Sequence, residues 1–409
     1  MSTTEDASSC DRRRIVTDTD AELLALARAM TDLDHPVKRE AADWAAAELG
    51  QADLVDADHR SVFAIDDWRR CADRGIHRLM VPEEHGGLGA DRATTLLTLE
   101  GLGYGCTDNG LTFALASQIV SSQVTLVRFA TDEQRERWLP GLLDGSMFAA
   151  LAMTEPGSGS DAFSLQATAT KQADGTYVLN GHKAYLTFGP VADLCIAFAS
   201  TRPEAGSWGV SAFLVPMDLP GVVQGPLREK MGMRTTPFGD IEFRDVVLPA
   251  DALLSREGAG ASIFSAVLDI ERAYVFAPQI GAMERQLHDA TAYALEREQG
   301  GQPIARYQAV SHRLVAMKER HEHCRLLLYR AAMADVTGRG MSLAASLAKI
   351  ATADAGIASS VDAALLHGAK GYVSEFEIER QLRDAVGGLV YSGTTDVLRN
   401  IVARHLGVV

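Results

Sequence analysis

Residues 151–161, Leu-Ala-Met-Thr-Glu-Pro-Gly-Ser-Gly-Ser-Asp, have the composition of a strand end that breaks into a ligand-binding loop. The apolar run ends at Met153, and the proline and the two glycines that follow interrupt regular structure. Thr154 and Ser160 supply hydroxyl donors, while Gly159 lets the backbone approach a ligand closely. The amides of such a loop can face an electron-rich ring or a phosphate. An ordinary turn has the same composition, so composition alone does not decide between the two.

An aromatic-x-Thr triplet, Tyr185-Leu186-Thr187, follows farther along the chain. Together the loop and the triplet resemble the flavin-binding segments of the acyl-CoA dehydrogenase family, and the likeness runs from about residue 20 to the C-terminus. The resemblance implies FAD as cofactor, with Thr154 at the pyrimidine edge of the isoalloxazine ring, Tyr185 near the ring and Thr187 near N5. At this end the implied FAD-binding residues are Met153, Thr154, Gly159, Ser160, Tyr185 and Thr187.

The adenosine end of FAD is implied by three more segments. Arg297 and Gln308 match the family segment that reaches the FAD of a neighbouring subunit, which implies a homo-oligomer, most simply a homotetramer. Gly368 lies in a family-like glycine turn. Thr394 and Asp396 occupy the positions that meet the adenine-side phosphates and ribose.

The base is the least regular part of the resemblance. Dehydrogenating a thioester requires a carboxylate that removes the α-proton while the β-hydrogen leaves as hydride. Most of the family carries this glutamate where the present chain has Ser392, and serine cannot do that work unaided. A minority places it on an earlier helix within Leu-Asp-x-Glu-Arg, and this chain has that pattern at residues 268–272. Glu271 is therefore the predicted base, although a Glu-Arg couple on a helix is more often a solvated ion pair. The Ser392 N–H is predicted to polarise the thioester carbonyl.

Several positions depart from the family pattern, namely Phe238 for Thr, Gly300 for Phe, Leu365 for Gln and Ser392 for Glu. These departures suggest a divergent branch, such as a biosynthetic enzyme that acts on a carrier-tethered acyl or aminoacyl group. The predicted function is FAD-dependent oxidation of an acyl thioester of coenzyme A or of an acyl carrier protein, with an electron-transfer flavoprotein or oxygen as acceptor. A flavin monooxygenase on the same fold and a non-catalytic flavin-binding partner are the alternatives.

The elements that must position these residues follow the hydrophobic period. Helical spacing predicts a helical N-terminal domain over 20–147 after a disordered head at 1–19, and a period of two predicts a β-domain over 148–255. Within it, Asn180-Gly181 is a hairpin dipeptide at a strand end. Helices return over 256–409, as the family's C-terminal four-helix bundle, so the fold class is α+β and acyl-CoA dehydrogenase-like.

Composition limits the partners and the compartment. The 409 residues carry a formal net charge of −15, which argues against nucleic acid and anionic membrane as partners. Five scattered cysteines without CxxC spacing indicate reduced thiols and no zinc site, and hence a cytoplasmic protein. We expect no metal, and no apolar run approaches the length needed to span a membrane.

Overall fold

The computed structural model describes residues 17–50 and 53–409. The predicted disordered head therefore lies outside the described residues, except for its last three positions. There the prediction is wrong, because helix α1 already begins at Asp18. Its N-cap is Thr17, whose hydroxyl accepts a hydrogen bond from the Asp20 amide and so satisfies one of the free donors of the first turn.

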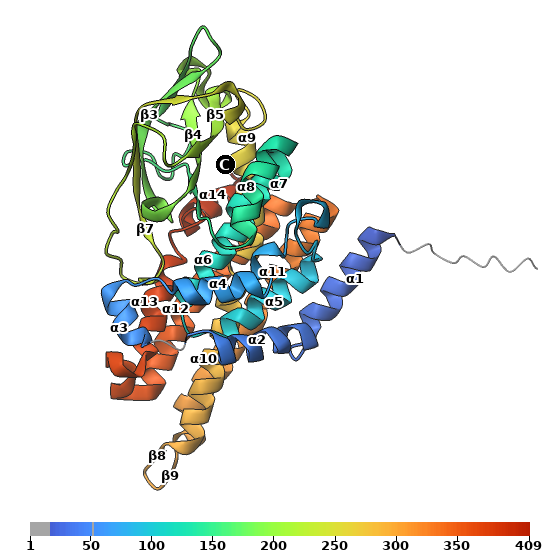
Figure 1. The fold of residues 1–409 in the computed structure, drawn as a ribbon. Helices are drawn as coiled ribbons and strands as arrows, with labels where there is room; N and C mark the ends of the chain where they lie inside the picture. The colour runs from blue at the N-terminus through green and yellow to red at the C-terminus, as the bar shows by residue number, and fades with distance from the viewer. Residues whose placement is uncertain (1–16, 51–52) are drawn as a thin grey trace, which may run out of the picture.

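The first third of the chain is helical and is drawn in blue to teal in Figure 1. Helix α8 begins with a capping box, in which Thr131 and Gln134 each accept a hydrogen bond from the other's amide. The elements are α1 (Asp18–Thr31), α2 (Pro36–Glu48), α3 (Leu54–Arg60), α4 (Ile65–Asp73), α5 (Arg92–Gly105), α6 (Asn109–Ser117), the π-helical turn η3 (Gln118–Gln123), α7 (Val124–Phe129) and α8 (Asp132–Leu143).

A seven-stranded sheet with the order β1-β4-β2-β3-β7-β6, and with β5 paired to β4, follows the helices. Its strands are β1 (Ala149–Ala152), β2 (Thr168–Lys171), β3 (Tyr177–Thr187), β4 (Leu194–Ser200), β5 (Val210–Pro216), β6 (Val222–Gln224) and β7 (Phe238–Leu248). Strand β4 is buried on both faces. Leu194, Ile196 and Phe198 pack toward α8 and α9, while the residues between them join a core inside the curled sheet.

The prediction of a turn at Asn180-Gly181 is wrong. Both residues lie inside β3, at a register shift in its pairing with β7. Gly181 is needed there because a Cβ at this position would come within 2.4 Å of the Ala167 side chain. The Asn180 side chain meanwhile bonds to Asp245 across the bulge. The dipeptide therefore marks a bulge and not a reversal of the chain.

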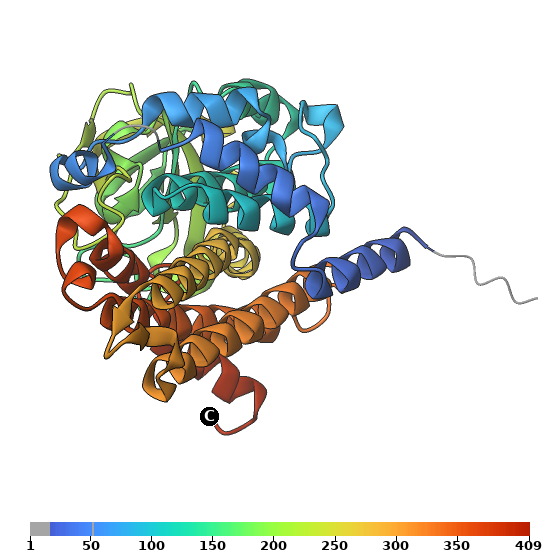
Figure 2. The same ribbon diagram turned by 90° about the horizontal axis from the view of Figure 1, so that it is seen from below.

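Six helices complete the fold, and Figure 2 shows the long ones from below. They are α9 (Gly260–Tyr274), α10 (Ala277–Glu296), α11 (Gln308–Thr337), α12 (Met341–His367), α13 (Ile378–Gly387) and α14 (Thr395–His405), with the hairpin β8 (Glu298–Gln299) and β9 (Gln302–Pro303) between α10 and α11. The apolar stripe of α9, Ile263, Val267, Ile270 and Tyr274, is buried as its helical spacing predicts. The α+β fold class with a helical front, a central sheet and a helical bundle is confirmed.

The expectation that no apolar run is long enough to span a membrane is wrong. The helical stretch Asn109–Phe129 is long and apolar enough to cross a membrane by length and composition. It passes through the middle of the protein, however, and 83% of its most apolar window is buried inside the fold. A helix buried to this extent is a core helix. The apolar composition of Asn109–Phe129 follows from its contact with the sheet and the bundle.

Candidate active site

The carboxylate of Glu271 meets two serine hydroxyls. Ser392 Oγ donates to Glu271 Oε1 at 2.5 Å, and Ser121 Oγ donates to Glu271 Oε2 at 2.7 Å. The three residues come from α9, from the turn before α14 and from the π-helical turn η3, so the site forms where the helical N-terminal domain meets the C-terminal bundle. The structure thus brings together the two residues predicted to be catalytic, although 121 positions separate them in the sequence.

Helix α9 fixes the turn that carries Ser392 through a hydrogen bond. Ser392 has φ = +56°, a conformation that non-glycine residues adopt only when their surroundings enforce it. Arg272, the residue after Glu271, donates from Nε to the Ser392 carbonyl at 2.9 Å and is paired with Asp269 at 3.2 Å. Burial lowers the pKa of Arg272, with Asp269 acting in the opposite direction. The same helix therefore supplies the carboxylate and fixes its partner.

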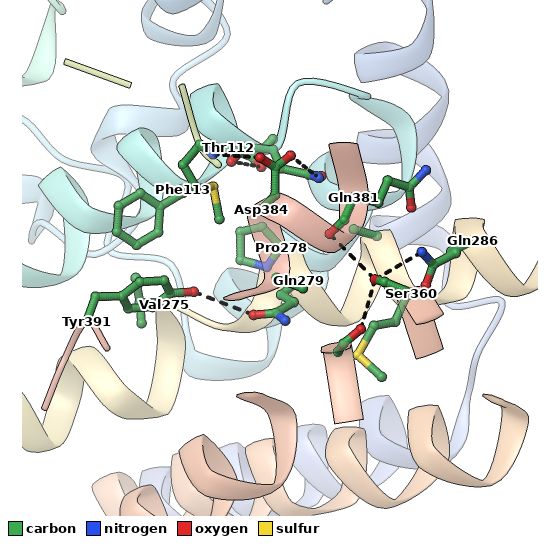
Figure 3. A pocket seen from close by; sticks show the side chains of 16 residues that line it. Thr112, Phe113, Val275, Pro278, Gln279, Gln286, Ser360, Gln381, Asp384 and Tyr391 are labelled. Carbon is green, nitrogen blue, oxygen red and sulfur yellow. Dashed lines mark hydrogen bonds between the residues drawn. The ribbon is translucent and has the colours of Figure 1, made fainter. Parts of the chain in front are cut away.

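Aromatic side chains close the site on one side, beside a small cavity of about 40 Å³ (Figure 3). The Tyr391 ring lies 4.6 Å from that of Phe113 and stacks at 5.1 Å on Phe276 (centroid distances). Tyr391 also donates to Gln279 Oε1 at 3.5 Å. Burial, followed by the charge of Glu271, raises the pKa of the Tyr391 phenol above its usual range, so the hydroxyl stays a donor.

A buried ion pair anchors the loop after β1. Lys183, fully buried on β3, donates to Glu155 Oε1 at 2.8 Å and to the Met153 carbonyl at 3.0 Å. Glu155 also accepts from the amides of Gln166 and Ala167, so that its charge is compensated from several sides. Burial lowers the pKa of the Lys183 ammonium, and Glu155 offsets part of that shift. The loop is therefore tied to the strand that carries the Tyr185-x-Thr187 triplet.

Strand β3 changes register where it meets this loop. The shift lies between Lys183 and Leu186, and Tyr185 adopts φ = +62° and is about half exposed. The Tyr185 amide donates to Asp240 Oδ1, and Arg228 holds the same carboxylate with two hydrogen bonds. These bonds from Arg228 lower the pKa of Asp240 to about 2. The bulge aims Tyr185 outward, as bulges beside active sites commonly do.

The residues at this end fit a flavin. The Thr154 carbonyl accepts from the Ala184 amide at 2.9 Å, which places the loop against the strand that carries Thr187. A side chain at Gly159 would meet nothing within 4 Å, so open space lies beside the loop, and Ser160 is exposed there. An exposed aromatic ring, hydroxyl donors and free space are together suited to binding an isoalloxazine ring.

The residues predicted for the adenosine end lie elsewhere. Arg297 and Gln308 are exposed beside the β8–β9 hairpin, which Figure 1 places at the opposite end of the molecule from the sheet. Gly368 ends α12 next to a cavity of about 330 Å³ that His367 and Lys370 help to line. A single protomer therefore does not bring this group to the loop after β1.

The last two predicted positions lie at the start of α14. Thr394 is its N-cap and accepts from the Val397 amide at 3.2 Å, while Asp396 is exposed and paired with Arg399 at 2.9 Å. A helix N-terminus favours an anionic group such as a phosphate. This start follows the Ser392 turn directly, so it belongs to the same end of the molecule as Glu271.

Sequence reasoning missed three parts of the site. Ser121, the Glu155–Lys183 pair and Asp240 bear on the residues above through contacts across long stretches of chain. Glu155 gave a local signal, because it is one of the two acidic residues of the predicted loop. Ser121 gave none, since a serine within an apolar helix is ordinary.

Comparison with known proteins divides the chain into three domains in the same order as the fold. Models of the N-terminal, middle and C-terminal domains of acyl-CoA dehydrogenase match residues 31–146, 150–246 and 258–407. An L-prolyl-[peptidyl-carrier protein] dehydrogenase of Pseudomonas fluorescens is 38% identical over 374 residues, 91% of this chain and 98% of that protein. The crystal structure of the prolyl acyl carrier protein oxidase AnaB has a TM-score of 0.89 and 38% identity, with coverage of 91% and 98%. The structure of PigA with FAD and proline has a TM-score of 0.88 and 32% identity, with coverage of 92% and 99%.

Proposed function

Because the chain belongs to the acyl-CoA dehydrogenase family, we propose that it oxidises a small aminoacyl group, of the size of proline, held as a thioester on a carrier protein. The chain is an FAD-dependent dehydrogenase that acts on acyl thioesters. What we propose is the identity of the carrier and of the acyl group. The observation that carries it is the Glu271–Ser392 contact beside an aromatic wall, which pairs a relocated base with a short acyl site.

Glu271 takes the α-proton in this mechanism. Its carboxylate is held by hydroxyls on both oxygens, so the base is oriented before the substrate arrives. The Ser392 amide polarises the thioester carbonyl, which acidifies the α-carbon. FAD, when bound by the loop after β1 and the Tyr185-x-Thr187 segment, supplies the acceptor for the hydride that leaves Cβ. The products are an α,β-unsaturated thioester and a protonated Glu271.

The size of the acyl group follows from the aromatic wall. Tyr391 stacks on Phe276 and lies tilted against Phe113, and a cavity of about 40 Å³ adjoins Phe113 and Tyr391. Phe113 and Tyr391 line this cavity, and the closely packed rings favour a short acyl group over a long alkyl chain. A small ring or a short chain beside Glu271 fits this geometry, and the carrier-bound prolyl group named for two relatives is of this kind.

We also propose that the protein works as a homotetramer. Arg297 and Gln308 are exposed beside the β8–β9 hairpin, which lies at the opposite end of the protomer from the sheet (Figure 1). Their use in FAD binding therefore requires a second copy of the chain, which supplies them to its neighbour's cofactor.

The function is tested by anaerobic bleaching of the bound flavin with matched thioesters. A prolyl group on a carrier protein, the same group on coenzyme A, and butyryl- and octanoyl-CoA are compared at equal concentration. We expect the prolyl carrier thioester to reduce the flavin fastest and octanoyl-CoA slowest. Faster reduction by either acyl-CoA would overturn the substrate assignment, and no reduction by any thioester would favour the monooxygenase or non-catalytic alternatives. Admitting air afterwards tests oxygen as the acceptor against an electron-transfer flavoprotein.

A further inference from the structure

The helical stretch through the protein centre contains a π-helical turn. Residues 118–123 form this turn between α6 and α7, and every one of them is buried. A π turn inserts an extra residue into a helix and rotates the side chains after it relative to those before it, and such turns occur frequently at functional sites. Here the turn packs against α9 and β1, the two elements that carry the proposed base and lead into the loop predicted to bind FAD.

Side chains of this turn contact both of those elements. Ser121, 4% exposed, donates to Glu271 Oε2 at 2.7 Å. Gln118 accepts from the Ala149 amide at 3.1 Å, and Ser122 donates to the Ala149 carbonyl at 3.3 Å. Ala149 is the first residue of β1, the strand that ends in the Thr154 loop. One short turn thus bonds to the base and to the start of the strand that leads into the cofactor loop.

We propose that Ser121 is a positioning residue, and that the π-helical turn fixes the orientation of Glu271 relative to the cofactor loop. This inference rests on the proposed role of Glu271 as the base. Carboxylate rotation about the last side-chain bond is soft. Ser392 holds one oxygen and Ser121 the other, so the plane of the carboxylate is set only when both hydroxyls are present. Ser121 does not contact the substrate in this proposal, because it acts through Glu271.

Single-turnover flavin reduction of the FAD-loaded tetramer tests this role. With saturating prolyl carrier thioester, Ser121→Ala is expected to lower the reduction rate about tenfold, since a misoriented base removes the α-proton more slowly. The dissociation constant of the thioester should stay within about twofold, because binding does not use this hydroxyl. The primary isotope effect with an α-deuterated substrate should rise, because proton removal becomes more rate-limiting. Ser121→Thr, which keeps the hydroxyl, should retain more of the rate than Ser121→Ala.

Thr125→Val is the matched control. Thr125 is fully buried in the adjoining turn and donates only to the Ser121 carbonyl, at 2.6 Å, so its loss removes a buried hydroxyl without touching the base. FAD content and the thermal midpoint are recorded for each variant. An unchanged rate and isotope effect in Ser121→Ala, with Glu271→Gln inactive, would overturn the positioning role alone. A fall in rate equal to that of Thr125→Val would also overturn it. If Glu271→Gln is fully active, the proposed function itself fails.

Discussion

Replacing Glu271 by glutamine removes the carboxylate and leaves the rest of the site in place. The amide has nearly the same volume and keeps one oxygen as acceptor, while its NH₂ becomes a donor. Ser121 and Ser392 are hydroxyls, which donate or accept by rotating, so each can still bond to the amide at its present distance. We therefore expect the free energy of unfolding to change by less than about 1 kcal/mol.

The chemical cost is far larger than the structural one. A positioned general base contributes about 100-fold or more, and a 100-fold loss equals about 2.7 kcal/mol in the barrier. Ser392→Ala should cost much less, because only its backbone amide is proposed to meet the substrate. Ser392→Glu on the Glu271→Gln background should restore part of the rate, since the two side chains are in contact and point to the same place.

Stopped-flow flavin reduction by saturating thioester measures these rates, with FAD content checked for every variant. Reduction by Glu271→Gln at the parental rate, with FAD still bound, would refute the assignment of the base. Loss of FAD together with activity would instead show that Glu271 has a structural role, which also contradicts the reasoning above.

Three further predictions concern stability and assembly. Glu155→Ala leaves the buried Lys183 ammonium without its carboxylate, so guanidinium unfolding should show a loss of about 3–5 kcal/mol; a loss below about 1 kcal/mol would contradict this. Arg297→Ala should lower FAD retention and tetramer content together in light scattering, and a variant that keeps FAD as a tetramer would exclude Arg297 from the cofactor site. Burial lowers the pKa of His77 to about 4, against about 6.5 unfolded, so the unfolded chain binds the proton first as pH falls. Stability should therefore decline between about pH 6.5 and 4, by up to about 3 kcal/mol from this group, and less so in His77→Gln; equal declines would contradict the assignment.

The order of helical and sheet segments was readable from the sequence because it depends on local periodicity. The stripe of α9 is visible as spacing and is buried as that spacing requires, while β4 is an almost continuous apolar run and is buried on both faces. The Asn180-Gly181 dipeptide was misread because the same two residues suit a turn and a bulge. Only the pairing of β3 with β7 decides between the two structures.

The sequence by itself determined the family resemblance, the cofactor loop and Glu271 as the best candidate base, because these rest on residue types at fixed spacing. The tertiary structure alone decided that Glu271 meets Ser392 and Ser121, which lie 121 and 150 positions away. It also decided that the helix through the centre has a π turn at Gln118–Gln123. Nothing local specifies that turn. Its polar side chains bond to β1, α9 and the end of α8, so packing against these elements selects the turn over a continuous α-helix and thereby places Ser121 beside the base.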